Sequence, residues 1–290
     1  MKKIICFMLC FIILASLGTV AFADTVDSRV VLGADLNEEQ IKSVYNMFSI
    51  NQGSATELKI TNAEEREYLE GFVDSAIIGT RSISCVYVEL RGEGEGMSIT
   101  TSNINWCSPE MYISALATAG ITDARIEVAA PVEVSGTAAL TGIYKAYEDM
   151  TGQKLDNIAK LVSTQELTIT GELAAQIGSI DSTSIVNELK LMLDETAKMS
   201  DEEIKSQIIY IASQYDVTLT EGQIQQLIDL CRSLEKLDGD ALKARVEEVQ
   251  QTLTKLANAK TKVVGFVDNV KKVVTSIAEF FERIKGIFAK

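Results

Sequence analysis

Hydrophobic and polar positions follow one rhythm in the first half of the chain and another in the second half. Across residues 77–145, short apolar runs at 83–90, 97–101 and 124–129 are separated by turn-forming residues. Short apolar runs bounded by Gly, Asn, Ser or Pro are typical of strands. The stretch therefore predicts the order strand, tight loop, strand, helix, strand, helix, and we expect the rest of the chain to be organised around it.

Helix starts are marked by side chains that can satisfy free backbone amides. Capping-box patterns, in which two side chains cap each other's backbone, occur at Asn37 with Gln40, Ser200 with Glu203, and Thr220 with Gln223. Asn62 with Glu65 indicates a further short helix. Ser108 before Pro109 predicts a capped helix that stops at Gly120. Strands are expected at 29–32 and 57–60.

From residue 181 onward, apolar positions recur three and four residues apart, which is the period of helices packed on one face. Leu242, Val246, Val249, Leu253 and Leu256 continue this spacing with charged residues between them. That spacing is typical of a coiled-coil-like seam. The last third of the chain is therefore predicted to be helical.

These patterns predict an α+β fold. An N-terminal domain at 24–152 should hold a small mixed or antiparallel sheet with helices against it. Residues 153–180 read as short amphipathic pieces and a boundary region, followed by a helical hairpin or bundle at 181–260. A basic amphipathic helix is expected at 261–290.

The first 23 residues have the composition of a secretory signal peptide. Lys2 and Lys3 precede an almost unbroken apolar run at 4–20, and Ala21-Phe22-Ala23 matches a small-x-small cleavage pattern. We expect cleavage after Ala23 and a secreted, extracytoplasmic protein. A retained membrane anchor is the alternative, because about 17 apolar residues approach the length that spans a bilayer.

Charge and missing residue types exclude several functions. The chain carries a formal charge of −14, which repels nucleic acid, so no nucleic-acid partner is expected. It contains no histidine, which excludes imidazole-based triads and His-ligated metal sites. The cysteines left after cleavage are Cys85, Cys107 and Cys231; Cys85 and Cys107 either pair or remain buried thiols. We predict no catalytic residue, no metal site and no cofactor.

A few residues are candidates for binding. Arg81 lies between two hydroxyl residues and could hold an anion, although a structural ion pair is the alternative. Trp106, the only tryptophan, could stack on a sugar or peptide, or it could anchor the core. Glu93 and Glu95 lie in a glycine-rich loop that could contact calcium, or could simply be the exposed tip of a hairpin.

The C-terminal segment differs in charge from the rest of the chain. Residues 255–290 contain eight Lys or Arg and three acids. An apolar helix face is predicted at Phe266, Val270, Val274, Ile277, Phe281, Ile284 and Phe288. A basic amphipathic helix of this kind could lie on a membrane surface or a wall polymer, or pack on another helical chain or on its own neighbours.

Several motifs in the central stretch resemble a known family. They lie at 78–84 (IGTRSIS), 105–106 (NW), 110–112 (EMY), 115–120 (ALATAG), 128–132 (VAAPV) and 134–142 (VSGTAALTG). With these motifs the chain resembles the YpuA-like family of exported Gram-positive proteins, whose domain is one of unknown function (1002). The resemblance runs from about Val30, is most specific at 77–145, and implies export and a shared fold, without catalytic residues.

The leading hypothesis is an uncharacterised exported protein of the cell envelope with a non-enzymatic binding or structural role. One rival is a carboxylate-dependent hydrolase acting on a cell-wall polymer, for which Glu110, Glu89 and Glu127 are the nearest acids. Such an enzyme needs two carboxyl groups about 5–9 Å apart in a cleft. A self-associating coiled-coil protein is a third hypothesis.

Overall fold

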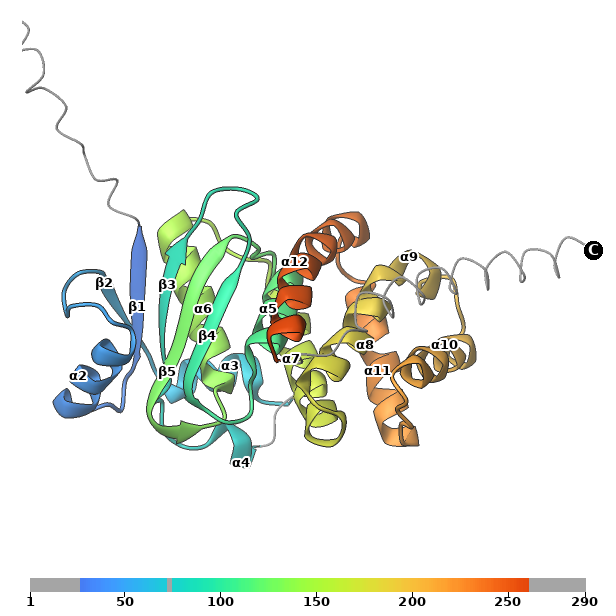
Figure 1. Ribbon diagram of the computed structural model, residues 1–290, viewed down its shortest axis with the longest axis horizontal. Coiled ribbons are helices and arrows are strands. Elements are labelled where there is room, and N and C mark those ends of the chain that lie inside the picture. The colour runs from blue at the N-terminus through green and yellow to red at the C-terminus, as the bar shows by residue number, and fades with distance from the viewer. Residues whose placement is uncertain (1–26, 72–74, 261–290) are drawn as a thin grey trace, which may run out of the picture.

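The computed structural model describes residues 27–71 and 75–260 (Figure 1). Its strands are β1 (Ser28–Gly33), β2 (Thr56–Ile60), β3 (Cys85–Leu90), β4 (Ser98–Ile104) and β5 (Ala124–Val134). Its helices are α2 (Glu38–Met47), α3 (Asn62–Leu69), α4 (Ser75–Ile78), α5 (Pro109–Ala119), α6 (Thr137–Thr151), α7 (Asn157–Ile177), α8 (Ser179–Leu191), α9 (Leu193–Thr196), α10 (Asp201–Gln214), α11 (Glu221–Leu234) and α12 (Gly239–Lys260). The predicted α+β class, with a sheet followed by a helical region, is confirmed.

The strands form one mixed sheet in the order β2-β1-β3-β5-β4. β1 runs parallel to β2 and antiparallel to β3, while β5 runs antiparallel to β3 and parallel to β4. β3 and β4 are consecutive in the chain but are not neighbours, because β5 lies between them. The hairpin interpretation of the glycine-rich loop is therefore wrong. The loop instead crosses the start of β5, where Asp123 accepts hydrogen bonds from Arg91 N (3.2 Å) and Gly96 N (2.7 Å).

Alternate residues of each strand bury opposite faces of the sheet, as the strand repeat of two requires. On one face, Val31, Val86 and Val128 pack against α5 and α6. On the other face, Val30 and Tyr87 pack against α2. Both faces thus have an apolar layer, and the larger core lies on the side of α5 and α6.

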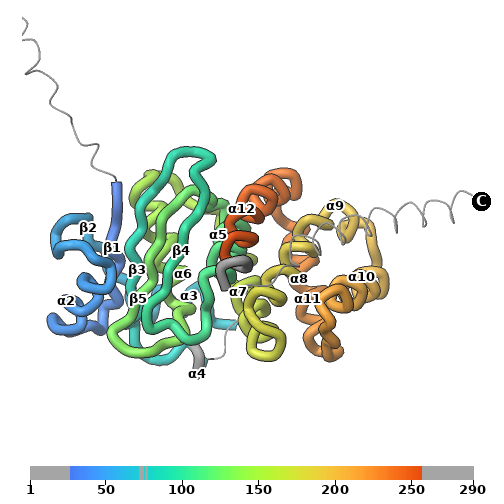
Figure 2. The backbone as a smooth tube through the Cα atoms, viewed as in Figure 1, coloured from blue at the N-terminus to red at the C-terminus, as the bar shows by residue number. Residues whose placement is uncertain are grey.

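A second core holds the helical half together. α8, α10 and α11 supply most of it, and Figures 1 and 2 show these helices beside the sheet half with α7 and α12 at the junction. α12 contributes Leu242 and Val246 to the helical core and Val249 and Leu253 to the sheet core. The predicted 242–256 seam is therefore used inside the chain, where it joins the two cores.

Local signals in the sequence differ in how well they specify structure. The capping boxes of α2, α10 and α11 form as predicted. Helix α3 is capped by Thr61 and Glu64, one residue earlier than expected. Ser108 occupies the N-cap of α5, but its hydroxyl makes no capping bond. The sequence predicted short helical pieces at 153–180, but residues 157–177 form the single helix α7. Apolar and hydroxyl residues of α7 are buried together against α5, α8 and α11, which explains its length.

Two further findings concern sulfur and membranes. Cys85, Cys107 and Cys231 are free and buried, so the possible Cys85–Cys107 bridge does not form. Within residues 27–71 and 75–260, no helix combines the length and apolar character needed to cross a bilayer.

Candidate functional site

The candidate site is a charged pocket between α3, α6 and α7, with a volume of about 190 Å³. Six charged residues of the described ranges line it: Glu64 and Glu67 on α3, Lys145 and Glu148 on α6, Lys154 in the following loop, and Lys160 on α7. The lining charges are thus balanced, three positive and three negative. We refer to this cavity as the charged pocket.

Helical spacing explains why these side chains converge. Thr141, Lys145 and Glu148 are four and three residues apart on α6, so they lie on one helix face. Glu64 and Glu67 are likewise three apart on α3. The pocket therefore lies along the contact of these two helices, and α7 closes it.

Glu148 is bonded by two lysines. Its carboxylate accepts from Lys160 Nζ at 2.9 Å and from Lys154 Nζ at 2.7 Å. The side chains of Lys160 and Glu148 are 5% and 9% exposed. Burial raises the pKa of Glu148, but the hydrogen bonds from Lys154 and Lys160 outweigh it and leave the pKa below its ordinary value. Burial lowers the pKa of Lys160, yet the bonds to Glu148 and Tyr68 leave it raised.

A second ion pair forms another wall of the pocket. Lys145 Nζ donates to Glu64 Oε1 and to the carbonyl of Lys59, both at 2.6 Å. Glu67, one turn further along α3, is exposed and makes no ion pair within the described part of the chain. The pocket thus has a surplus of positive charge at Glu148 and one unpaired carboxylate at Glu67.

Neutral side chains complete the lining. The ring of Tyr68 lies 5.0 Å from Lys160 Nζ in a cation–π contact, and it meets Tyr144 edge-on at 6.4 Å between centroids. Thr141 is 4% exposed, and its hydroxyl has no hydrogen-bond partner among residues 27–71 and 75–260. A buried hydroxyl without a partner costs free energy, so it marks a place where a ligand could contribute a hydrogen bond.

The direction of the pKa shifts indicates what this pocket can do. A general acid or base works best with a pKa near the working pH. Here the pKa of Glu148 is lowered and that of Lys160 is raised, so both groups stay charged around neutral pH. Fixed charges suit binding of a charged ligand better than transfer of a proton.

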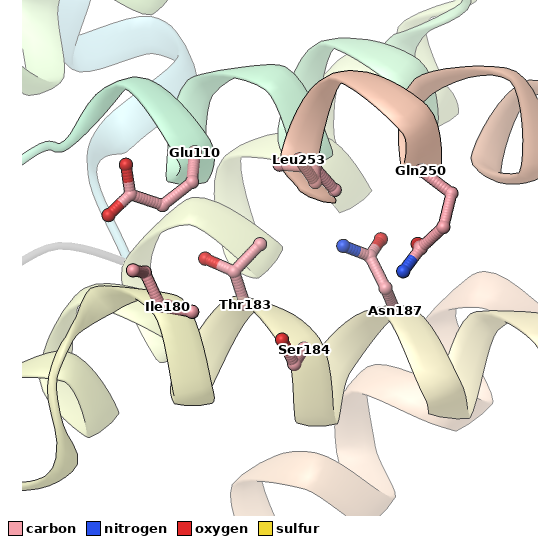
Figure 3. A pocket seen from close by; sticks show the side chains of 7 residues that line it. All are labelled: Glu110, Ile180, Thr183, Ser184, Asn187, Gln250 and Leu253. Carbon is pink, nitrogen blue, oxygen red and sulfur yellow. The ribbon is translucent and has the colours of Figure 1, made fainter. Parts of the chain in front are cut away.

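A second, smaller cavity lies where α5, α8 and α12 meet (Figure 3). Its volume is about 10 Å³, which is room for about one water molecule. Thr183 Oγ1, Asn187 Nδ2 and Gln250 Oε1 line it without hydrogen-bond partners in the described chain. Figure 3 shows Asn187 and Gln250 pointing toward one another across the gap. This cavity is too small for an organic ligand.

A buried ion pair between α7 and α8 also contacts α5. Lys190 Nζ donates to Glu166 Oε1 at 2.9 Å and also to Ser114 and Thr118. The Lys190 side chain is fully buried, which lowers its pKa, and the carboxylate of Glu166 opposes that shift. Because every donor points at a protein acceptor, we assign this group to the joining of α5, α7 and α8.

The structure does not bring the predicted binding residues together. Arg81 is exposed and donates to the carbonyl of Asp35 at 3.0 Å. Trp106 is half-buried and packs its ring against Gly171 of α7, so it acts as an anchor. Glu93 and Glu95 lie on the exposed loop, where Glu95 accepts from Gly92 N at 2.9 Å.

No group of three or more Cys, Asp or Glu side chains in the described ranges is placed to hold a metal ion. The predicted apolar face from Phe266 to Phe288 lies outside the described residues.

The three acids named for a hydrolase are also separated. Glu89 and Glu127 lie on the outer face of the sheet, where both contact Arg125, at 3.4 Å and 2.5 Å. Glu110 is buried at the far side of α5, where it accepts from the Ser179 hydroxyl. Glu89 and Glu127 are thus both held by one arginine, and Glu110 is not part of that group.

Sequence reasoning missed the charged pocket. Its signals are weak: Thr141 is a polar residue in an apolar stretch of α6, and Lys160 interrupts an apolar stretch of α7. Neither is unusual alone, and only the packing of α3 against α6 and α7 shows that they face one cavity.

Comparisons with known proteins identify relatives. The model of the family described as "Protein of unknown function (DUF1002)" matches residues 32–256. The "Uncharacterized protein YpuA" of Bacillus subtilis (strain 168) is 36% identical over 293 residues, which cover 98% of this chain and 97% of that protein. No solved structure matches.

Proposed function

The chain belongs to the DUF1002 family of proteins of unknown function, and from this premise we propose that it is an exported, non-enzymatic binding protein of the cell envelope. The binding role rests on one observation. The charged pocket holds three lysines, three glutamates and an unpartnered buried hydroxyl in a cavity open to a ligand.

The non-enzymatic part of the proposal follows from how those charges are held. Ion pairs keep Glu148 and Lys160 charged, and the 290-residue sequence has no histidine to shuttle a proton near pH 7. Glu89 and Glu127 lie on the face of the sheet that packs against α2, and they share Arg125. A carboxylate hydrolase needs two acids that face a substrate across a cleft, whereas here both acids are held by one arginine.

Export and attachment rest on the two ends of the chain. Residues 1–23 have the order of a signal peptide, and residues 255–290 carry a net positive charge on an otherwise acidic protein. We propose that residues 261–290 attach the protein to a membrane surface or a wall polymer.

Binding to isolated cell walls tests the proposal. We expect the purified protein to bind wall fragments saturably and to leave their composition unchanged over hours. Fragments that shorten during incubation, with the activity abolished by Glu127→Gln or Glu148→Gln, would show that the protein is a hydrolase.

Attachment is tested separately with the chain ended after residue 260. This shortened protein should lose most of its retention on anionic liposomes or walls, and retention of the full chain should weaken with salt. Equal recovery of the two proteins would remove residues 261–290 as the attachment element.

A further inference from the structure

The charge distribution in the charged pocket has two poles. Glu148 is bonded by both Lys154 and Lys160, so one positive charge there is in excess. Lys145 and Glu64 neutralise one another. Glu67 adds a negative charge that no lysine or arginine of the described ranges pairs. A ligand that matches these poles carries one negative and one positive group.

We propose that the charged pocket binds a short peptide whose two termini are free, with its carboxylate beside Lys154 and Lys160 and its ammonium beside Glu67. This inference rests on the proposed function, since it names the class of ligand for the same pocket.

Ligands of one sign fit less well. An anion would gain from Lys154 and Lys160, as the peptide carboxylate does, but would leave Glu67 unpaired. A cation would meet Glu67 favourably but would be repelled by the buried ammonium of Lys160. Like charges in a partly desolvated site cost far more than they do in water, so the balanced ligand is favoured.

The size of the pocket sets the length of the ligand. Thr141 and Glu148 are seven residues apart on α6, about 10 Å along the helix axis. A free amino acid cannot reach the Glu148 pole and the Thr141 hydroxyl together, whereas two or three residues at about 3.5 Å each can. The Thr141 hydroxyl then pairs with a backbone amide of the peptide. At about 190 Å³ the pocket is smaller than the ~300–1,000 Å³ of typical drug-sized sites, which also favours a short peptide.

Calorimetric titration with four probes tests this assignment. The probes are alanyl-alanine, N-acetyl-alanyl-alanine without the ammonium, alanyl-alanine amide without the carboxylate, and alanine as the short zwitterion. We expect alanyl-alanine to bind, and each of the other three to bind about tenfold more weakly or worse, as the loss of one charge-assisted hydrogen bond predicts.

Variants locate the two ends of the peptide. Glu67→Gln should weaken the binding of alanyl-alanine but leave the binding of N-acetyl-alanyl-alanine unchanged, so that the two affinities become alike. Thr141→Val keeps the side-chain shape but removes the hydroxyl. It should weaken the binding of every probe that has a peptide bond. Lys205→Met, which removes a surface ion pair with Glu221 far from these helices in the chain, is the control and should change nothing.

The outcomes separate this inference from the proposed function. Equal binding of the blocked and free peptides, or no change with Glu67→Gln, overturns the peptide assignment. If walls retain the protein but none of the four probes binds, the assignment is wrong and the proposed function stands. If walls release products instead, the proposed function itself fails. Both Glu67 and Lys205 lie at the surface, so their variants test binding without a large cost in folding.

Discussion

Three carboxylates with little exposed surface, Glu148, Glu65 and Glu188, differ in whether a lysine is bonded to them. Glu148 has two lysine partners and a lowered pKa. Glu65 and Glu188 have no lysine partner among the described residues, and burial raises the pKa of each to about 7. Hydrogen bonds from Ser82 and Asn62 oppose this shift at Glu65, and one from Tyr215 opposes it at Glu188. The first kind suits a binding pocket, whereas the second makes the stability of the fold depend on pH.

Glu188→Gln should change that pH dependence. Between the ordinary pKa of 4.5 and the folded pKa of about 7, the unfolded chain releases the Glu188 proton while the folded chain keeps it. The free energy of unfolding therefore falls as pH rises through this window, by about 3 kcal/mol for a shift of this size. The variant should be more stable relative to the wild type at pH 8 than at pH 5 in urea unfolding. An equal difference in stability between variant and wild type at pH 5 and pH 8 would contradict a raised pKa of Glu188 in the folded protein.

Gly171→Ala tests the role of Trp106. A Cβ at Gly171 would overlap the Trp106 ring, so the ring or α7 must shift. We expect the free energy of unfolding to fall by about 1–3 kcal/mol, as in other overpacked cores. The emission maximum of Trp106, the sole tryptophan of the sequence, should change as well. Gly222→Ala on α11 has open space around it and is the matched control. An unshifted spectrum in Gly171→Ala would show that Trp106 does not depend on this contact.

At the scale of single elements, helix starts could be read from the sequence and strand neighbours could not. Asn37, Ser200 and Thr220 cap their helices as their spacing predicts, because a capping box needs only four consecutive residues. The position of β5 between β3 and β4 depends on pairings between residues at least 27 apart in the chain, such as Ser98 with Arg125. The charged pocket has the same origin, since Tyr68 and Lys160 meet only through the packing of α3 on α7.

Ser200→Ala measures what one capping box contributes. The Ser200 hydroxyl accepts from Glu203 N, while Glu203 accepts from Ser200 N at 2.8 Å. Removing the hydroxyl should lower the free energy of unfolding by about 1 kcal/mol. Ser206→Ala, in the same helix, removes only a bond to the Glu202 carbonyl and should cost less. Equal losses would mean that the cap does not stabilise α10.

At the scale of the whole molecule, the two largest cores of the described chain share two helices. α7 supplies Leu167 to the sheet core and Leu173 to the helical core, and α12 is divided in the same way. The buried Lys190–Glu166 pair lies at this junction. Because both helices would be only half-packed if one core melted, the halves should unfold together.

Leu253→Ala tests this cooperativity. Leu253 is buried on the sheet side of α12, and its truncation should lower the free energy of unfolding by about 2–4 kcal/mol. Trp106 fluorescence and far-ultraviolet circular dichroism should shift to lower denaturant together, in one transition. Ile209→Ala on the exposed face of α10 should have little effect. Two separated transitions would show that the cores are independent.

The central claim is that this protein binds through the charged pocket and leaves its ligand unchanged. Amide chemical-shift mapping with peptide fragments released from isolated cell walls tests both halves of that claim in one sample. Among the described residues, we predict shifts confined to α3, α6 and the start of α7, including Tyr68, Tyr144 and Lys160, with constant ligand signals throughout the incubation. Shifts centred elsewhere, or new ligand signals that grow with time, would contradict the account.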